Sequence, residues 1–283
     1  MNSQQSVAVI GAGTMGNGIA QACAVAGLDV QMVDVSDAAL AKGVGTIGAS
    51  LERLVKKDKL NNEDRDAALK RVRATTDYSA IANADVVIEA ATENVAVKID
   101  ILRKVDSVIR PDATLATNTS SISITQLAAV TSNPGRFIGM HFFNPVPMMA
   151  LVELIRGLQT SDETVARAQA LAKALGKTPI VVKNSPGFVV NRILCPMLNE
   201  AIFAFQEGIA GAQEIDDGMK LGCNHPIGPL ALCDLVGLDV LLAVMNVFYN
   251  DFNDPKYRPA PLLKEMVAAG YIGRKSGRGF YTY

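Results

Sequence analysis

Apolar positions along the first two thirds of the chain follow two alternating patterns. Short runs of β-branched and aliphatic residues, typical of buried strands, alternate with longer segments whose apolar residues recur every three or four positions, as on one face of a helix. The expected strands cover residues 7–10, 30–33, 85–89, 114–117, 137–141, 151–155 and 179–182. Strands that alternate with helices in this way predict an α/β fold with a doubly wound, mostly parallel sheet.

The segment between the second and third of these strands is too long for a simple crossover. Its periodicity predicts two helices, at about 38–57 and 63–72, which would form a helical hairpin that projects from the sheet. Basic residues concentrate near the turn of this hairpin, at Arg53, Lys56, Lys57 and Lys59.

After the sequence KNSPG at 183–187 the pattern changes, because strand signals mostly vanish and helical periodicity continues alone. The expected helices cover 188–206, 213–221, 230–235, 238–250 and 261–268. We therefore predict a domain boundary near 184–187, with an α/β domain over 1–185 and an all-helical domain over 186–283. The apolar faces of these helices exceed what a lone bundle of this size needs, which predicts burial against a second subunit.

Two polar features of the helical part are also expected. Asp216, Asp217 and Lys220 are spaced as on a solvated helix face. The final segment GRKSGRGFYTY is basic, but its aromatic residues predict that it docks onto the domain.

Composition and charge narrow the functional classes. The chain has 283 residues, of which 49% are hydrophobic and 19% charged, and its formal net charge is −1. A nearly neutral protein has no broad electrostatic field that would attract nucleic acid or an anionic membrane surface. We expect no membrane span, because no apolar run reaches about 18 residues. The N-terminal sequence MNSQQSVAVIG enters the first strand almost at once, so we also expect no signal or transit peptide and a cytoplasmic location.

The cysteine and histidine content argues against metal chemistry. Four cysteines, at positions 23, 195, 223 and 233, show no C-x-x-C spacing, which predicts reduced and mostly buried thiols. The sequence holds two histidines, His141 and His225, so we expect no metal site of clustered His and Cys ligands.

The first strand runs into the sequence VIGAGTMG, which carries a glycine motif. A strand that stops on G-x-G-x-x-G and opens a helix binds a pyrophosphate at the helix N-terminus. Gly11 permits the tight turn, Gly13 lets the backbone approach the phosphates, and Gly16 lets the helix lie close to the strand. Thr14 and Met15 lie between the last two glycines and belong to the same expected cofactor site.

The second strand ends on an acidic residue, Asp34, which lies 18 residues after Gly16. A carboxylate at this place hydrogen-bonds the ribose hydroxyls of NAD and repels the 2′-phosphate of NADP. Val35 and Ser36 follow, with no arginine to accept that phosphate. The motif therefore predicts an NAD-type Rossmann site, and the alternative is a glycine turn in another α/β fold.

His141 lies at the end of an apolar strand, in the sequence GMHFFNPVP. Ligands bind at this edge of open α/β sheets, although a lone histidine among apolar residues is more often structural. In the next expected strand, strict alternation places Glu153 on the face opposite Val152 and Leu154. A carboxylate on a largely apolar strand needs a partner, and His141 is the nearest candidate. A His–carboxylate pair beside a nicotinamide would be a general base held in one tautomer.

Other polar candidates each allow two interpretations. The segment TNTSSISI at 117–124 either forms an ordinary helix cap, or its Asn118 and Ser120 point into the cleft as hydrogen-bond donors. Asn191, in SPGFVVNR, either faces the cleft or is a buried amide bonded to backbone. Glu93 and Lys98 follow the strand DVVIEAATE, and the simplest interpretation is an exposed ion pair, although five residues is poor helical spacing.

With these residues identified, the chain resembles the 3-hydroxyacyl-CoA dehydrogenase family nearly from end to end, and most closely its short bacterial members that act on 3-hydroxybutyryl-CoA. The resemblance covers VIGAGTMG, EAATEN, TNTSS, HFFNPVPMMALVE, SPGFVVNR, DDGMKLGCNHPIGPLALCDLVGLD and GRKSGRGFYTY. It implies a Rossmann-like N-terminal domain, a helical dimer-forming C-terminal domain, and the reversible NAD-dependent oxidation of (S)-3-hydroxybutyryl-CoA to acetoacetyl-CoA.

The resemblance also implies roles for single residues. His141 matches the catalytic base and Glu153 its orienting carboxylate, while Ser120 and Asn191 match residues that hydrogen-bond the C3 oxygen of the substrate. Contacts around the nicotinamide half of NAD are implied for Glu93, Lys98, Asn118, Ser120, Asn144 and Lys275. Contacts to the coenzyme A substrate are implied for Ser50, Lys57 and Ser120.

Two other functions fit parts of the pattern. A 3-hydroxyacid dehydrogenase of the 6-phosphogluconate type also joins a Rossmann domain to a helical domain, but it uses a lysine for acid–base work and acts on free acids. Lys183 lies at the boundary, yet His141 and Glu153 have no role in that scheme. A catalytically inactive NAD-binding protein would be expected to lose this pair or the serine, and the chain keeps them.

Overall fold

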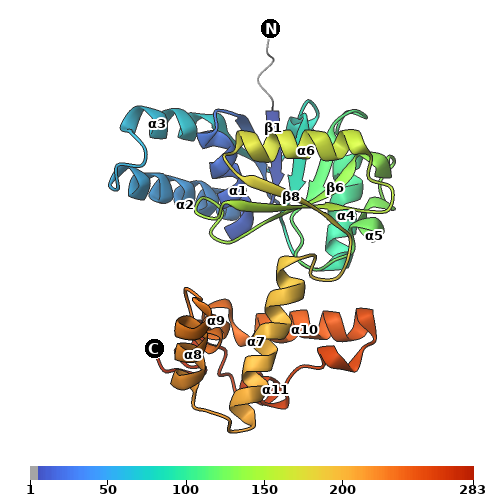
Figure 1. The fold of residues 1–283 in the computed structure, drawn as a ribbon. Helices are drawn as coiled ribbons and strands as arrows, with labels where there is room; N and C mark the ends of the chain where they lie inside the picture. Colours follow the sequence, from blue (N-terminus) through green and yellow to red (C-terminus); the bar gives the residue numbers. More distant parts are fainter. Residues whose placement is uncertain (1–5) are drawn as a thin grey trace. The chain divides into compact units, whose positions relative to one another are not determined.

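The computed structural model describes residues 6–283, which divide into two compact units that adjoin in sequence at Ser185 and Pro186. The first unit is a sheet flanked by helices, and the second is built from helices (Figure 1). Each unit has its own apolar core.

The sheet of the first unit has eight described strands in the order β3-β2-β1-β4-β5-β6-β7-β8. Within it, every neighbouring pair is parallel except β6–β7, which is antiparallel. The strand order reverses between β1 and β4, which is where open α/β sheets bind ligands. The strands are β1 (Ser6–Ile10), β2 (Asp29–Val33), β3 (Val72–Thr75), β4 (Val86–Glu89), β5 (Thr114–Thr117), β6 (Phe137–Phe142), β7 (Leu151–Arg156) and β8 (Thr178–Lys183).

The helices of the first unit are α1 (Thr14–Val25), α2 (Asp37–Val55), α3 (Asn62–Arg71), α4 (Val95–Asp106), α5 (Ile124–Ala128) and α6 (Asp162–Ala174), with 3₁₀ turns η1 (Tyr78–Ile81) and η2 (Pro134–Arg136). An apolar cluster joins the sheet to α1, α2 and α6 through buried residues that include Val9, Ile19, Ile47 and Leu171. Burial of such apolar area is the main stabilising contribution to folding. The mostly parallel, Rossmann-like fold predicted from the sequence is confirmed.

The expected hairpin is formed by α2 and α3, which extend past the edge of the sheet (Figure 1). Ser36 caps α2 by accepting a hydrogen bond from the Ala39 N–H, and buried Ile47 and Leu51 anchor the helix in the apolar cluster. The sequence-based end of the second helix was wrong, because Val72 begins strand β3 rather than ending α3. This four-residue edge strand is only partly buried, so it lacks the apolar run that marks the other strands.

The second unit contains α7 (Val190–Gln206), α8 (Ala212–Cys223), α9 (Pro229–Val236), α10 (Leu238–Phe252) and α11 (Pro261–Ala268), with 3₁₀ turns η3 (Pro255–Tyr257) and η4 (Arg274–Ser276). Its core includes Leu198, Ile202, Leu230, Met245 and Phe248.

Two buried carboxylates hold the final residues onto this unit. Asp234 accepts hydrogen bonds from the backbone N–H groups of Phe280 and Tyr281, both at 2.9 Å. The Tyr281 hydroxyl donates to Asp216 at 2.8 Å. The tail therefore docks, as its aromatic residues predict, but Asp216 is 3% exposed and the solvated face expected for it was wrong. Asp217 does lie at the surface, where it pairs with a lysine.

The four cysteines are free, and three of them are buried: Cys23, Cys195 and Cys233. Burial raises the pKa of the Cys23 and Cys195 thiols to about 12. These two thiols are therefore protonated at neutral pH, and a protonated thiol is a poor nucleophile.

Over residues 6–283, no individual helix has both the length and the apolar character to cross a bilayer. The pair α9–α10, bent by 97°, meets that test of length and composition only when its two helices are taken together.

Candidate active site

The glycine-rich turn joins β1 to α1 in the way the motif predicts. Gly11 has φ +104°, and a Cβ at this position would lie 2.7 Å from the Ala91 Cα. A Cβ on Gly16 would overlap the carbonyl oxygen of Gly11. A Cβ on Gly13 would meet no described atom within 4 Å, so the space in front of this glycine is open. The turn fits a pyrophosphate, because N–H groups at a helix N-terminus face an open cradle that a side chain would fill.

Asp34 follows β2 and reaches back to this turn. Its Oδ2 accepts a hydrogen bond from the Ala12 N–H at 2.8 Å, and its Oδ1 lies 3.3 Å from the donating Ser36 N–H. The carboxylate is thereby fixed beside the phosphate cradle, where lone pairs remain for ribose hydroxyls.

A cavity of about 220 Å³ opens between the glycine-rich turn and the loop after β4. It lies at the reversal point of the strand order. It brings together many of the residues expected to contact the cofactor, with its lining made by Gly13, Thr14, Met15, Ala90, Ala91, Thr92, Glu93, Lys98 and Asn118.

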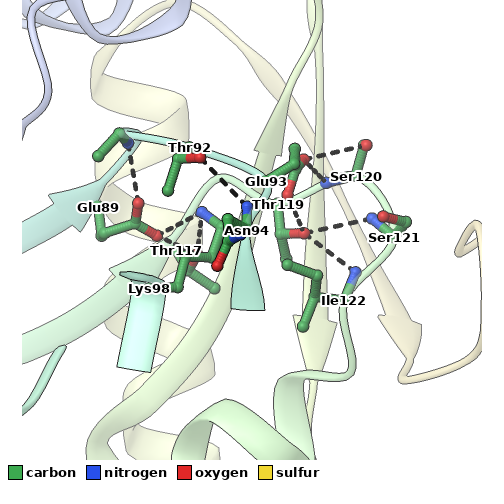
Figure 2. A network of polar contacts seen from close by, with 11 residues as sticks. Glu89, Thr92, Glu93, Asn94, Lys98, Thr117, Thr119, Ser120, Ser121 and Ile122 are labelled. Carbon is green, nitrogen blue, oxygen red and sulfur yellow. Dashed lines mark hydrogen bonds and ion pairs between the residues drawn. The ribbon is translucent and has the colours of Figure 1, made fainter. Parts of the chain in front are cut away.

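Glu93 and Lys98 have separate partners, so the surface ion pair suggested by the sequence was wrong (Figure 2). Lys98 is 1% exposed, and its Nζ lies 2.6 Å from Oε2 of Glu89. Glu93 accepts hydrogen bonds from the Thr119 hydroxyl at 2.8 Å, the Ser120 N–H at 2.8 Å and the Ser120 hydroxyl at 3.1 Å. Glu93 therefore orders the loop that carries Ser120.

Glu89 was missed by the sequence reasoning. It is the last residue of β4, is fully buried, and accepts hydrogen bonds from the Thr117 hydroxyl at 2.7 Å and the Ala91 N–H at 2.8 Å. Thr117 is its register partner on β5. A signal was present, because a glutamate that ends the apolar run DVVIE needs a buried partner.

Asn118 and Ser120 do not cap a helix. Ser123 is the N-cap of α5 and accepts a hydrogen bond from the Gln126 N–H. Asn118 instead joins neighbouring strand ends, since its Oδ1 accepts from the Phe142 N–H at 2.9 Å. Both candidates thus belong to the loop beside the cavity, while the helix cap that the segment TNTSSISI also predicted is present at Ser123.

His141 and Glu153 are directly opposite in the register of β6 and β7. Nδ1 of His141 lies 2.7 Å from Oε2 of Glu153, so the contact expected from the sequence is present. Glu153 is fully buried and His141 is 6% exposed. The ring of Phe143 packs against the imidazole with a centroid distance of 4.5 Å. Because the carboxylate holds Nδ1, proton exchange with a bound molecule would take place at Nε2.

The remaining candidates lie elsewhere. Asn144 is exposed in the loop after β6. Ser50 lies on α2, and Lys57 is exposed in the turn that follows it. Asn191 and Lys275 belong to the second unit, Asn191 in the first turn of α7 and Lys275 in η4, where its Nζ lies 2.7 Å from Oδ2 of Asp239.

A Rossmann-like sheet, an open phosphate cradle, an acidic residue after β2 and a buried His–Glu pair define the class of NAD-binding dehydrogenases. Two models of the 3-hydroxyacyl-CoA dehydrogenase family match the chain. The model of the NAD-binding domain matches residues 6–185, and the model of the C-terminal domain matches residues 187–283. The chain belongs to the 3-hydroxyacyl-CoA dehydrogenase family, and its first unit is the NAD-binding domain of that family.

Individual relatives agree with this result. A probable 3-hydroxybutyryl-CoA dehydrogenase of Deinococcus radiodurans is 52% identical over 275 residues, which cover 97% of this chain and 99% of the relative. The 3-hydroxybutyryl-CoA dehydrogenase of Clostridioides difficile is 49% identical, with coverages of 98% and 99%. The crystal structure of (S)-3-hydroxybutyryl-CoA dehydrogenase PaaH1 from Ralstonia eutropha shares 65% identity over 99% of each chain, with a TM-score of 0.97.

Proposed function

We propose that this enzyme interconverts (S)-3-hydroxybutyryl-CoA and acetoacetyl-CoA with NAD, and that His141 and Glu153 are its general acid–base pair. The observation that carries the assignment of the pair is the 2.7 Å contact between the imidazole Nδ1 and a fully buried carboxylate. The substrate follows the names of relatives that align with nearly the whole chain.

The cofactor would lie across the reversal point of the sheet. The backbone at Gly11, Gly13 and Gly16 would hold the pyrophosphate and Asp34 the adenosine ribose. Residues of the cavity and its surrounding loops would hold the nicotinamide half: Thr14, Met15, Glu93, Lys98, Asn118, Ser120 and Asn144, with Lys275 from the second unit. When bound, NAD accepts or returns the hydride at C3 of the substrate.

His141 moves the proton. During oxidation, its Nε2 takes the proton of the C3 hydroxyl, and the Glu153 carboxylate stabilises the imidazolium that results. During reduction, the imidazolium returns this proton to the C3 oxygen. Proton transfer by a positioned side chain is worth about 10²–10⁴ in rate.

Ser120 and Asn191 would position the C3 oxygen. The Ser120 hydroxyl lies 3.1 Å from Glu93, which orients its oxygen within the loop. Because this hydroxyl donates its hydrogen to Glu93, its lone pairs can accept a hydrogen bond from a substrate hydroxyl. Asn191 would contribute an amide from the start of α7.

Coenzyme A would bind at the hairpin. Ser50 lies in the second half of α2, and Lys57 comes two residues after the end of this helix at Val55. Lys57 is exposed within a basic turn, and its charge would attract the phosphates of the coenzyme.

The second unit would form a homodimer. Several of its large apolar side chains are exposed, among them Ile193 at 67%, Ile209 at 71% and Leu221 at 85%. Exposed apolar area of this kind favours association. Light scattering on the purified protein should give the mass of two chains, and a mass of one chain would contradict the dimer.

The proposal includes a cytoplasmic location. Free thiols that are mostly buried are typical of a reducing compartment.

The decisive experiment follows NADH absorbance in the presence of acetoacetyl-CoA. We expect fast oxidation of NADH with this substrate, and slow or no reaction with NADPH or with free acetoacetate. NADH binding without turnover of the CoA ester would leave the cofactor site standing but refute the acyl-CoA assignment. Turnover of free acetoacetate at the same rate would instead favour a dehydrogenase of free hydroxy acids.

A further inference from the structure

Glu89 and Lys98 form a buried ion pair beside the cofactor cavity, and the mechanism above gives Glu89 no role. We propose that Glu89 is a positioning residue that sets the relative affinity for NAD⁺ and NADH, by cancelling the charge of Lys98 next to the nicotinamide half. The inference rests on the proposed function only for the placement of that half of the cofactor.

The position of Glu89 follows from the sheet. It ends β4, between its register partners Ile10 on β1 and Thr117 on β5. The glycine-rich turn begins directly after Ile10, so the carboxylate lies at the reversal point itself. Asp34, directly after β2, lies on the adenosine side of this point, and therefore the cavity on the β4 side receives the nicotinamide half.

The hydrogen bonds of the pair hold the carboxylate of Glu89 and the ammonium group of Lys98 in place. Oε2 of Glu89 accepts from Nζ of Lys98 at 2.6 Å and from the Thr117 hydroxyl at 2.7 Å, and Oε1 accepts from the Ala91 N–H at 2.8 Å (Figure 2). An ammonium has three N–H donors. Among the described residues, Glu89 and Thr117 take two of them, which leaves the third for a molecule bound in the cavity that Lys98 lines.

The two redox states of the cofactor differ by one charge on the nicotinamide ring, which is cationic in NAD⁺ and neutral in NADH. An ammonium without a counter-ion beside this ring would disfavour NAD⁺, because charges interact strongly where little water screens them. The Glu89 carboxylate, at 2.6 Å from the ammonium, cancels most of that field. Lys98 can therefore donate a hydrogen bond into the cavity without biasing the enzyme toward NADH.

Three variants of the full-length protein test the proposal: Glu89→Gln, Lys98→Met and the double variant. Dissociation constants are measured without substrate, for NADH by its fluorescence and for NAD⁺ by calorimetry. We expect the ratio Kd(NAD⁺)/Kd(NADH) to rise about three- to tenfold in Glu89→Gln, the order expected for one unit charge about 10 Å away at an effective dielectric constant near 20 with partial screening. The ratio should fall in Lys98→Met and return close to the wild-type value in the double variant.

A second buried ion pair supplies the matched control. Asp106 and Arg136 are 10% and 7% exposed. Arg136 belongs to η2, which directly precedes β6 and so lies at the amino end of that strand, whereas the cavity is lined by residues that follow the carboxyl ends of β1, β4 and β5. Asp106→Asn should lower the stability of the fold but leave the ratio unchanged. Glu89→Asp keeps the charge and shortens the side chain, so it should weaken the binding of NAD⁺ and of NADH by the same factor.

The direction in which the ratio Kd(NAD⁺)/Kd(NADH) changes distinguishes an effect of the Glu89 charge from a purely structural role in supporting the loop. A purely structural Glu89 would raise both dissociation constants equally, and an unchanged ratio in Glu89→Gln would overturn the proposal. A ratio that shifts in the same direction in both single variants would also overturn it. Thermal unfolding identifies any variant that fails to fold. If Glu89→Gln fails, the ratios measured for Lys98→Met and Glu89→Asp test the proposal in its place. If the wild-type enzyme failed to reduce acetoacetyl-CoA with NADH, this result would count against the proposed function alone.

Discussion

His141 and Glu153 face each other across the antiparallel pair of a sheet whose other described pairs are parallel. Directly opposed residues of antiparallel strands have their Cβ atoms about 4.5–5.5 Å apart. Backbone pairing alone therefore brings the imidazole and the carboxylate together, at 2.7 Å between Nδ1 and Oε2. The geometry of the pair is as rigid as the sheet that carries it.

Replacement of either partner should reduce turnover and spare the cofactor site. We expect His141→Ala to lower kcat for acetoacetyl-CoA reduction by about 10²–10⁴, because this variant lacks the proposed proton donor. Glu153→Gln should lower it less, since an amide can still accept from Nδ1 but cannot stabilise an imidazolium. NADH binding, followed by fluorescence, should change little in both variants. His225→Ala is the matched control, and activity in His141→Ala equal to that of the control would refute the assignment.

The basic turn of the hairpin should matter for the nucleotide part of the substrate. We expect Lys57→Ala to raise KM for acetoacetyl-CoA several-fold and to leave the Kd of NADH unchanged, because in the proposed complex the lost charge would face phosphates of coenzyme A. The difference in KM between wild type and Lys57→Ala should shrink at high salt, because salt screens the charge of the lysine. Lys173→Ala, an exposed lysine at the end of α6, is the charge-matched control. A pantetheine thioester without the nucleotide should be reduced equally by wild type and Lys57→Ala, and an equal loss with both substrates would contradict the role of Lys57.

Asp34 should determine the choice between NAD and NADP. Asp34→Asn keeps an acceptor for the Ala12 N–H but removes the negative charge that repels a 2′-phosphate. We expect kcat/KM with NADPH to rise relative to NADH by roughly tenfold, equivalent to about 1.4 kcal/mol. Wild-type enzyme that already prefers NADPH would show that Asp34 does not act in this way.

The hydroxyl of Tyr281 should stabilise the helical unit below alkaline pH. Burial and the hydrogen bond to Asp216 raise the pKa of this phenol above its ordinary value. A group whose pKa is raised by folding contributes stability that is fully present below its unfolded pKa, near 10, and is lost as pH rises further. We expect Tyr281→Phe to lower the free energy of unfolding by about 1–2 kcal/mol at neutral pH.

The same variant should also lose less stability than wild type between pH 10 and 11, although Tyr283 contributes in the same direction. Chemical denaturation at several pH values measures both effects. Parallel pH profiles for the two proteins would contradict this role of the Tyr281 hydroxyl.

Local sequence was sufficient for the parts of the site whose geometry is set within a strand or a turn. Gly11 and Gly16 are required by contacts of the turn itself, and a motif of fixed spacing records that requirement. Glu153 could be matched to His141 because strict alternation fixes which face of a strand a side chain occupies.

Features that depend on partners distant in sequence were missed. Glu89 and Lys98 meet because α4 folds back over the end of β4, and their spacing of nine residues belongs to no regular element. Asp216 is buried because its partners, Leu230 and Tyr281, arrive from α9 and from the tail. Such carboxylates look like surface residues until the elements that cover them are placed.

The docking of the tail has a consequence for the order in which the protein folds during synthesis. Every strand of the described sheet is complete once Lys183 has left the ribosome, so the first unit can fold while the second is still being made. Residues 280–283 supply the tyrosine hydroxyls that donate to Asp216 and Asp234, and the two backbone N–H groups that donate to Asp234. Until those residues emerge, two carboxylates of the helical unit depend on water for these hydrogen bonds, and their part of the unit is completed only when residues 280–283 dock.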